Sequence, residues 1–97
     1  LTPSNDGHSI RLSFPELTQE RRQELVRMVN SMAEEGKTRL RGIRRNSRKD
    51  LDDLASNGGI SEDNVKWLSS QLDDLTHTNE SEIEKSRSSK EEELLDV

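Results

Sequence analysis

The sequence predicts an all-α fold built from two long antiparallel helices, and three observations support this prediction. Apolar residues recur at spacings of three and four residues, which is the period of one helix face. Only 27% of the residues are hydrophobic while 36% are charged, a balance typical of long charged helices rather than of a compact globule. Asn57-Gly58-Gly59 interrupts the pattern, and so short a connection joins antiparallel neighbours.

Residues 1–15 precede the first helix and have the pattern of an extended segment. Thr2-Pro3 disfavours helix, Asn5-Asp6-Gly7 is a turn signal, and Pro15 ends the segment. Three apolar residues alternate with polar ones, as in a half-buried strand: Ile10, Leu12 and Phe14. A lone strand is not stable. We therefore expect its pairing partners outside this chain, and the chain to be a processed form or a piece of a longer protein.

The first helix is predicted to begin after Thr18, a suitable N-cap, and to end at the glycines after Asn57. It would contain about 39 residues and be about 58 Å long. Gly36 on its apolar seam indicates close approach of another helix or is simply tolerated, whereas Gly42 lies off the seam. The predicted seam consists of Leu25, Val29, Met32, Gly36, Leu40, Ile43, Ser47, Leu51 and Leu54.

The second helix is predicted to begin after Ser61, with Glu62 and Asp63 in its first turn, where the helix dipole favours negative charge. Its seam then becomes polar before Leu94, Leu95 and Val97 restore it. Because two helices bury little surface, we expect a third helix to cover the seam. The apolar seam residues are Val65, Leu68, Leu72 and Leu75, and the polar positions that follow are Asn79, Ser86 and Lys90.

Positive charge is gathered in one block of seven basic residues between Lys37 and Lys49, although the chain as a whole has a net charge of −5. The second half, residues 50–97, has fourteen acids and four bases. A polyanion would therefore be attracted to the block and repelled by the second half. A charge run on a helix is more often a solvated face, so spacing alone leaves RNA binding open. Four basic residues share one helix face: Lys37, Arg41, Arg44 and Arg48.

No pattern in the sequence predicts an enzyme, a cofactor, a metal site or a small-molecule substrate. The chain has no cysteine, and His8 and His77 lack neighbours at metal-ligand spacing. Asp73-Asp74 and the acids at 91–93 are interpreted as solvated faces, and no apolar run approaches membrane-spanning length. Trp67 is predicted to pack near the seam rather than to stack on a base.

Several motifs together resemble the C-terminal half of the ribosome recycling factor family, over nearly the whole chain. The segment S-E-D-N-V-K at 61–66 is most similar to cyanobacterial and plastid members. This similarity implies that the protein is located in the chloroplast stroma or a bacterial cytoplasm. The motifs are L-T-P-S-N-D-G-x-x-I-R-L (1–12), P-x-L-T-x-E-R-R-x-E-L-V (15–26), A-E-E-G-K (33–37), R-x-I-R-R (41–45) and I-S-E-D (60–63).

The resemblance implies a three-helix bundle with a small β domain inserted after its first helix. Residues 1–15 would be the last strand of that domain and the hinge, and residues 16–97 the second and third bundle helices. The first helix and most of the β domain would be absent from this chain. Family members bind large-subunit rRNA of the post-termination ribosome and split the subunits together with elongation factor G. They are not enzymes, because the elongation factor hydrolyses the GTP.

The rRNA-contacting arginines of the family lie in the motif R-N-[IV]-R-R-D, which reads Arg41 to Asn46 here. The resemblance therefore implies that Arg41, Arg44 and Arg45 contact RNA, and the basic stripe adds Lys37 and Arg48. Departures from the family pattern include Gly42 and Asn46 in this motif. Other departures, expected to weaken the bundle core, are Asn79, Ser86 and Arg87.

An alternative function is a divergent or truncated helical interaction module without recycling activity, which pairs through its exposed apolar seam. RNA binding would be sensitive to salt and would depend on the arginines. Pairing through the seam would respond little to salt and would depend on apolar residues, namely Leu25, Met32, Leu68 and Leu72.

Overall fold

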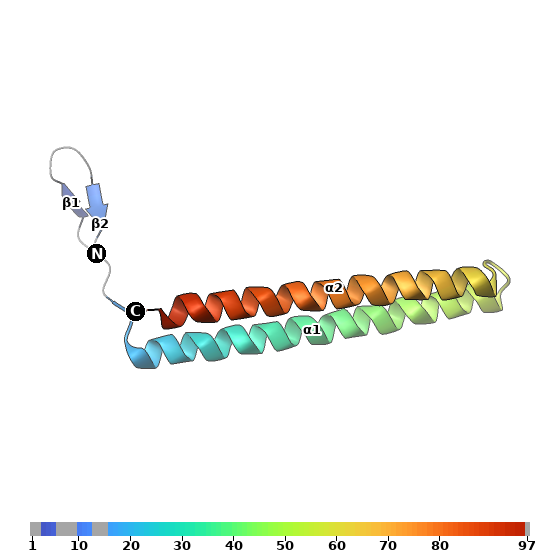
Figure 1. Cartoon of the computed structure of the whole chain (residues 1–97), viewed down its shortest axis with the longest axis horizontal. Coiled ribbons are helices and arrows are strands. Elements are labelled where there is room, and N and C mark those ends of the chain that lie inside the picture. Colours follow the sequence, from blue (N-terminus) through green and yellow to red (C-terminus); the bar gives the residue numbers. More distant parts are fainter. Residues whose placement is uncertain (1–2, 6–9, 13–15, 97) are drawn as a thin grey trace.

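Two long helices dominate the fold. The computed structural model describes residues 3–5, 10–12 and 16–96. Helix α1 spans Gln19–Ser56 and helix α2 spans Glu62–Leu95. They lie side by side and antiparallel, joined by a short turn at the end opposite the N-terminal residues (Figure 1). The predicted helical hairpin is therefore confirmed.

Both predicted helix starts are confirmed by their caps. The Thr18 hydroxyl accepts a hydrogen bond from the backbone N–H of Arg21 at 3.1 Å. The Ser61 hydroxyl does the same for Asn64 at 3.2 Å. Each hydroxyl satisfies an N–H that has no partner within its helix, which fixes where the helix begins.

The predicted stop at Asn57-Gly58-Gly59 is also confirmed. Gly58 has a φ of +75°, a left-handed conformation that costs glycine little and other residues more. The chain can then turn back so that the Gly59 N–H donates to the Leu54 carbonyl at 2.8 Å. This bond satisfies a carbonyl at the end of α1 and begins the reversal into α2.

The N-terminal segment contains two strands rather than one. Strand β1 spans Pro3–Asn5 and pairs antiparallel with β2, which spans Ile10–Leu12. The predicted strand at Ile10–Leu12 is confirmed, and one pairing partner lies within the chain, which was not expected. Pro, Ser and Asn have low strand propensity, so β1 gives no sequence signal of its own. The remainder of the expected strand, Phe14, and the turn at Asp6-Gly7 lie outside the described residues.

The contact between the helices is narrow. Among residues 16–96, only Ala33, Val65 and Ser69 are buried. Ala33 was not on the predicted seam, whereas the seam residues Met32 and Ile43 are 68% and 60% exposed. The apolar stripe of α1 is thus wider than the strip that one neighbouring helix can cover.

An open apolar face remains on one side of the hairpin. A groove of about 520 Å³ runs between α1 and the second half of α2. Leu75, at the same side of α2, is 62% exposed. Among the described residues nothing covers this face, and the expected third helix stays a prediction. Apolar residues that line the groove are Val29, Met32, Ala33, Leu40 and Ile83.

Gly36 marks a close approach of the two helices. A Cβ atom added there would lie 3.3 Å from Cδ1 of Ile83, which is tighter than ordinary van der Waals contact. At Gly42 an added Cβ would meet nothing within 4 Å. Of the two interpretations of Gly36, close approach is therefore confirmed.

These two glycines give a matched test of the packing. Gly42→Ala is expected to raise the free energy of unfolding by about 1 kcal/mol, because alanine has the higher helix propensity. For a chain of this size that corresponds to a Tm increase of about 4–8 °C. Gly36→Ala should raise the free energy of unfolding by less, since the added methyl group would lie unusually close to Ile83. Thermal unfolding followed by circular dichroism checks both, and equal gains would contradict the close approach.

Polar side chains tie the helices together where the apolar seam fades. Arg87, one of the positions expected to weaken the core, donates to Asn30 on α1 at 3.1 Å. It also pairs with Glu84 at 2.7 Å and Glu91 at 2.6 Å. Hydrogen bonds from Arg87 and Lys37 lower the pKa of the Glu84 carboxyl to about 2. An ionic network therefore joins the helices along this part of the hairpin.

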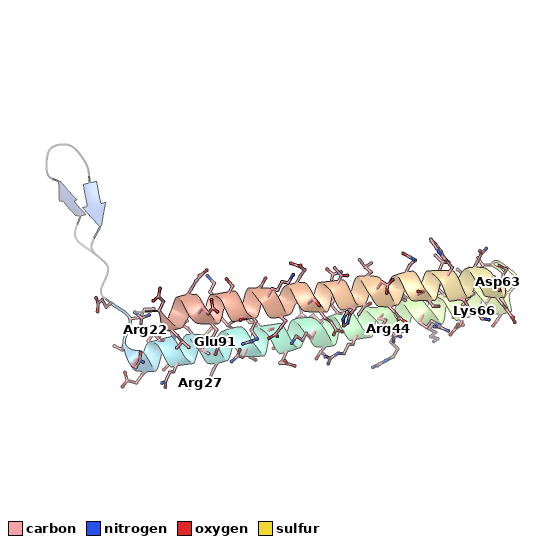
Figure 2. All side chains as sticks on the ribbon, viewed as in Figure 1. Arg22, Arg27, Arg44, Asp63, Lys66 and Glu91 are labelled. Carbon is pink, nitrogen blue, oxygen red and sulfur yellow. The ribbon has the colours of Figure 1, made fainter. Side chains whose placement is uncertain are left out.

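A second tie joins the outer ends of the helices. Nη1 of Arg22 donates to the carbonyls of Leu94 at 2.8 Å and Asp96 at 2.9 Å. The last turn of α2 has no basic residue of its own. Arg22 therefore supplies, from the start of α1, the positive charge that a helix C-terminus favours. Figure 2 shows Arg22 and Glu91 at this end of the hairpin, and Asp63 and Lys66 at the turn.

Candidate nucleic-acid interface

The predicted RNA-binding residues lie in the middle of α1, and three of them adjoin α2: Lys37, Arg41 and Arg44. Because α1 is helical throughout residues 37–48, its side chains at 37, 41, 44 and 48 share one face. Part of this face lies against acidic residues of α2, and the rest is exposed to solvent. The candidate residues are Lys37, Arg41, Arg44, Arg45 and Arg48.

Lys37 is the least accessible of the five, with a side chain only 17% exposed. Its ammonium Nζ lies 2.9 Å from Oε2 of Glu84 on α2 and 3.7 Å from Oε1 of Glu34. The hydrogen bond with Glu84 raises the pKa of the Lys37 ammonium. Lys37 therefore acts first as a tie between the helices.

Arg44 forms the shortest ion pair between the two helices. Its Nε donates to Oδ1 of Asp73 at 2.6 Å. This hydrogen bond lowers the pKa of the Asp73 carboxyl and raises that of the Arg44 guanidinium. Arg41 has a similar but looser partner, with its Nε 3.7 Å from Oε1 of Glu80. Arg44 is thus hydrogen-bonded to the neighbouring helix, whereas Arg41 is only close to a carboxylate of that helix.

The Nη groups of Arg41 and Arg44 remain available. A guanidinium has five N–H donors, and Arg44 uses its single Nε–H in the hydrogen bond to Asp73, whereas Arg41 lies too far from Glu80 for a hydrogen bond. Within the described part of the chain, no hydrogen bond involves the Nη atoms of Arg41 or Arg44. These atoms form the fork that pairs bidentately with a phosphate.

Arg45 and Arg48 lie beside these two arginines on α1. Nε of Arg48 donates to Asp52 of its own helix at 3.3 Å, an exposed pair of the kind that contributes little to stability. Arg45 is exposed and has no carboxylate within 4.0 Å among the described residues. Arg45 is therefore the most open cation of the five, and Lys37 the least.

The basic face has acidic partners that the sequence pattern does not reveal. Asp73, Glu80 and Glu84 lie opposite it on α2, so the prediction that Asp73 is only part of a solvated face is wrong. Their positions could have been predicted from the turn. In an antiparallel hairpin that reverses near Gly59, residues equally distant from the turn face one another, as Arg44 and Asp73 do.

A family comparison agrees with the sequence motifs. The model of the family described as ribosome recycling factor matches residues 1–95. The chain belongs to the ribosome recycling factor family. The resemblance predicted from the motifs is thereby confirmed.

Three relatives named ribosome-recycling factor align with all 97 residues of the chain. The protein of Rubrobacter xylanophilus is 44% identical, and the chain covers 52% of its length. The chloroplastic protein of Spinacia oleracea is 45% identical, with 36% of its length covered. The protein of Listeria innocua is 44% identical, with 52% covered. The chain thus spans about half the length, or less, of these relatives.

Trp67 of this recycling-factor chain differs from its prediction. Its side chain is 62% exposed, so it does not pack between the helices. Val65 and Ser69, on either side of it in the sequence, occupy the contact with α1 instead. Val65 and Ser69 are four residues apart and share one face of α2. Trp67 is two residues from each, about 200° around the helix, so its side chain points away from α1.

Among the described residues, no group of three or more His, Cys, Asp or Glu side chains is placed to hold a metal ion. Neither α1 nor α2 contains an uncharged apolar stretch of membrane-spanning length.

Proposed function

We propose that this chain serves in ribosome recycling, as the part of a translation factor that binds large-subunit rRNA. The observation that carries the proposal is the group of Arg41, Arg44 and Arg45 within five residues of one helix of the hairpin. Nε of Arg44 is hydrogen-bonded to α2, Arg41 lies 3.7 Å from a carboxylate of α2, and Arg45 is exposed. Relatives that are 44–45% identical over the whole chain are named ribosome-recycling factors.

The chemistry of the flank suits a folded RNA. Arginine keeps its charge at any physiological pH and pairs bidentately with phosphate oxygens. The major groove of an RNA helix is too narrow for side chains to read, so recognition depends on shape and on backbone contacts. A straight hairpin with arginines along one side is a suitable partner for such a surface.

The whole factor would split the post-termination ribosome together with elongation factor G. We propose that its contribution is binding and not catalysis, with GTP hydrolysis left to the elongation factor. Bacterial and chloroplastic relatives support a place in the bacterial cytoplasm or the chloroplast stroma.

Co-sedimentation with ribosomal subunits tests the proposal. The chain is expected to pellet with large subunits at low salt and to leave them as salt rises, because bound cations are replaced by counterions. Three to five phosphate contacts correspond to a slope of about −2 to −4 in a plot of log affinity against log salt concentration. Small subunits are the matched control. Equal pelleting with both subunits, or no response to salt, would contradict specific rRNA binding.

The open apolar face favours a second candidate function, a helical interaction module. Met32 and Ile43 are largely exposed on this face, and exposed apolar surface favours association. If a second copy of the chain covers it, sedimentation velocity should show a dimer that persists at high salt. Met32→Ser with Ile43→Ser should then yield a monomer without changing RNA binding.

A further inference from the structure

The interhelical pair of Arg44 and Asp73 has a geometry that bears on RNA binding. The two residues are 29 positions apart in sequence and come from different helices. Their hydrogen bond of 2.6 Å is at the short end for a charge-assisted contact. The Arg44 side chain is 42% exposed and that of Asp73 is 51% exposed. The pair therefore lies at the surface of the flank, within reach of a macromolecule.

The acid engages the side of the guanidinium that a phosphate does not require. Asp73 accepts from Nε of Arg44, and the described contacts leave both Nη groups unengaged. A surface arginine side chain without a partner samples many rotamers, and phosphate binding would have to select one of them. A second helix that holds Nε fixes the rotamer before RNA arrives, which reduces the entropy lost on binding.

We propose that Asp73 is a positioning residue for RNA binding, which holds Arg44 so that its Nη groups face the phosphate backbone. Glu80 lies 3.7 Å from Nε of Arg41, beyond hydrogen-bond distance, so it does not fix Arg41 in this way. This inference rests on the proposed function. Arg45 has no carboxylate partner among the described residues and adapts to the RNA. Arg44 then favours a particular RNA shape, while Arg45 contributes attraction of a more general kind.

The proposal predicts that removal of the Asp73 carboxylate weakens RNA binding, whereas charge repulsion alone would predict tighter binding. A carboxylate close to RNA repels it, so removing any acid should tighten binding if charge alone mattered. Asp74 provides the matched control. It follows Asp73 directly, carries the same charge, is exposed, and has no ion pair within the described part of the chain.

The test compares Asp73→Ala, Asp73→Asn and Asp74→Ala for binding to large ribosomal subunits at low salt. Asp73→Ala is expected to weaken binding about 3- to 10-fold, the effect of ordering one long side chain. Asp73→Asn should stay within about 2-fold of the original chain, because its amide oxygen still accepts from Nε. Asp74→Ala should bind as tightly as the original chain or slightly more tightly.

A double-mutant cycle separates positioning from general destabilisation. In an Arg44→Ala background, Asp73→Ala should have no further effect, because its action passes through Arg44. A variant that merely destabilised the hairpin would weaken binding in both backgrounds. Unchanged or tighter binding of Asp73→Ala, while Arg44→Ala loses affinity, would overturn the positioning role but leave the proposed function intact. No loss in Arg44→Ala would overturn the arginine contact itself, and positioning with it.

Discussion

Replacing Arg41, Arg44 and Arg45 together by alanine is expected to weaken binding to large ribosomal subunits by about 100-fold or more at low salt. Each arginine would lose at least one charge-assisted hydrogen bond to phosphate, and the three losses combine. The slope of log affinity against log salt concentration should become shallower by about 2 to 3, because fewer counterions are released. Co-sedimentation over a salt series measures both quantities.

A control with the same loss of charge shows whether position matters. Arg21, Arg39 and Lys85 are exposed and lie outside the candidate interface. Arg21 and Lys85 make only local pairs of the kind that contribute little, with Glu24 and Glu82. Their triple alanine variant should keep most of the affinity. If both triple variants lose binding equally, attraction by net charge rather than a defined arginine flank explains the result.

Replacing Arg87 by alanine is expected to loosen the half of the hairpin farther from the turn. Arg87 links Asn30 of α1 with Glu84 and Glu91 of α2. Without the guanidinium, Glu91 loses this ion pair, and Glu84 keeps only its pair with Lys37. A lower Tm and faster amide hydrogen exchange near Asn30 and Ile83 should follow. Lys85→Ala, which removes a charge on the exposed side of the same helix, is the control.

The same network predicts how stability depends on pH. The carboxyl of Glu84 has its pKa lowered to about 2 in the folded chain, because Arg87 and Lys37 donate hydrogen bonds to it. A lowered pKa favours the folded state above the ordinary value of 4.5. This contribution is lost as the pH falls from about 4.5 to about 2, since the folded state must then also take up the proton.

Glu84→Gln should therefore flatten the fall of Tm over that acidic range. It should not abolish the fall, because Asp73 also has a lowered pKa and contributes in the same direction. Glu82→Gln, which removes an exposed carboxylate two residues away, should leave the fall of Tm over that acidic range unchanged. An identical profile for the Glu84→Gln variant and the original chain would contradict the network.

The features that depend on local sequence were predicted well. The helix starts at Thr18 and Ser61 and the stop at Asn57-Gly58-Gly59 follow from hydrogen bonds between residues close in the chain. Such contacts need no knowledge of the rest of the fold. The family was also predictable, since motifs throughout the chain identify it and the family model matches residues 1–95.

Strand β1 shows where local propensity fails. Pro3–Asn5 has no strand signal, and it is a strand only because β2 pairs with it. A pairing interaction between two segments is not encoded in either segment alone.

The composition and periodicity of the sequence determined that this chain forms a helical hairpin with a basic block on its first helix. The tertiary structure decided which face of each helix meets the other. It placed Ala33 rather than Met32 in the contact, and it set Asp73, Glu80 and Glu84 against the basic stripe. The period of a helix fixes which residues share a face, but the rotation and register of two helices depend on how their side chains pack. For that reason the shared face of the basic residues could be predicted from the sequence, whereas the acids opposite them required the structure.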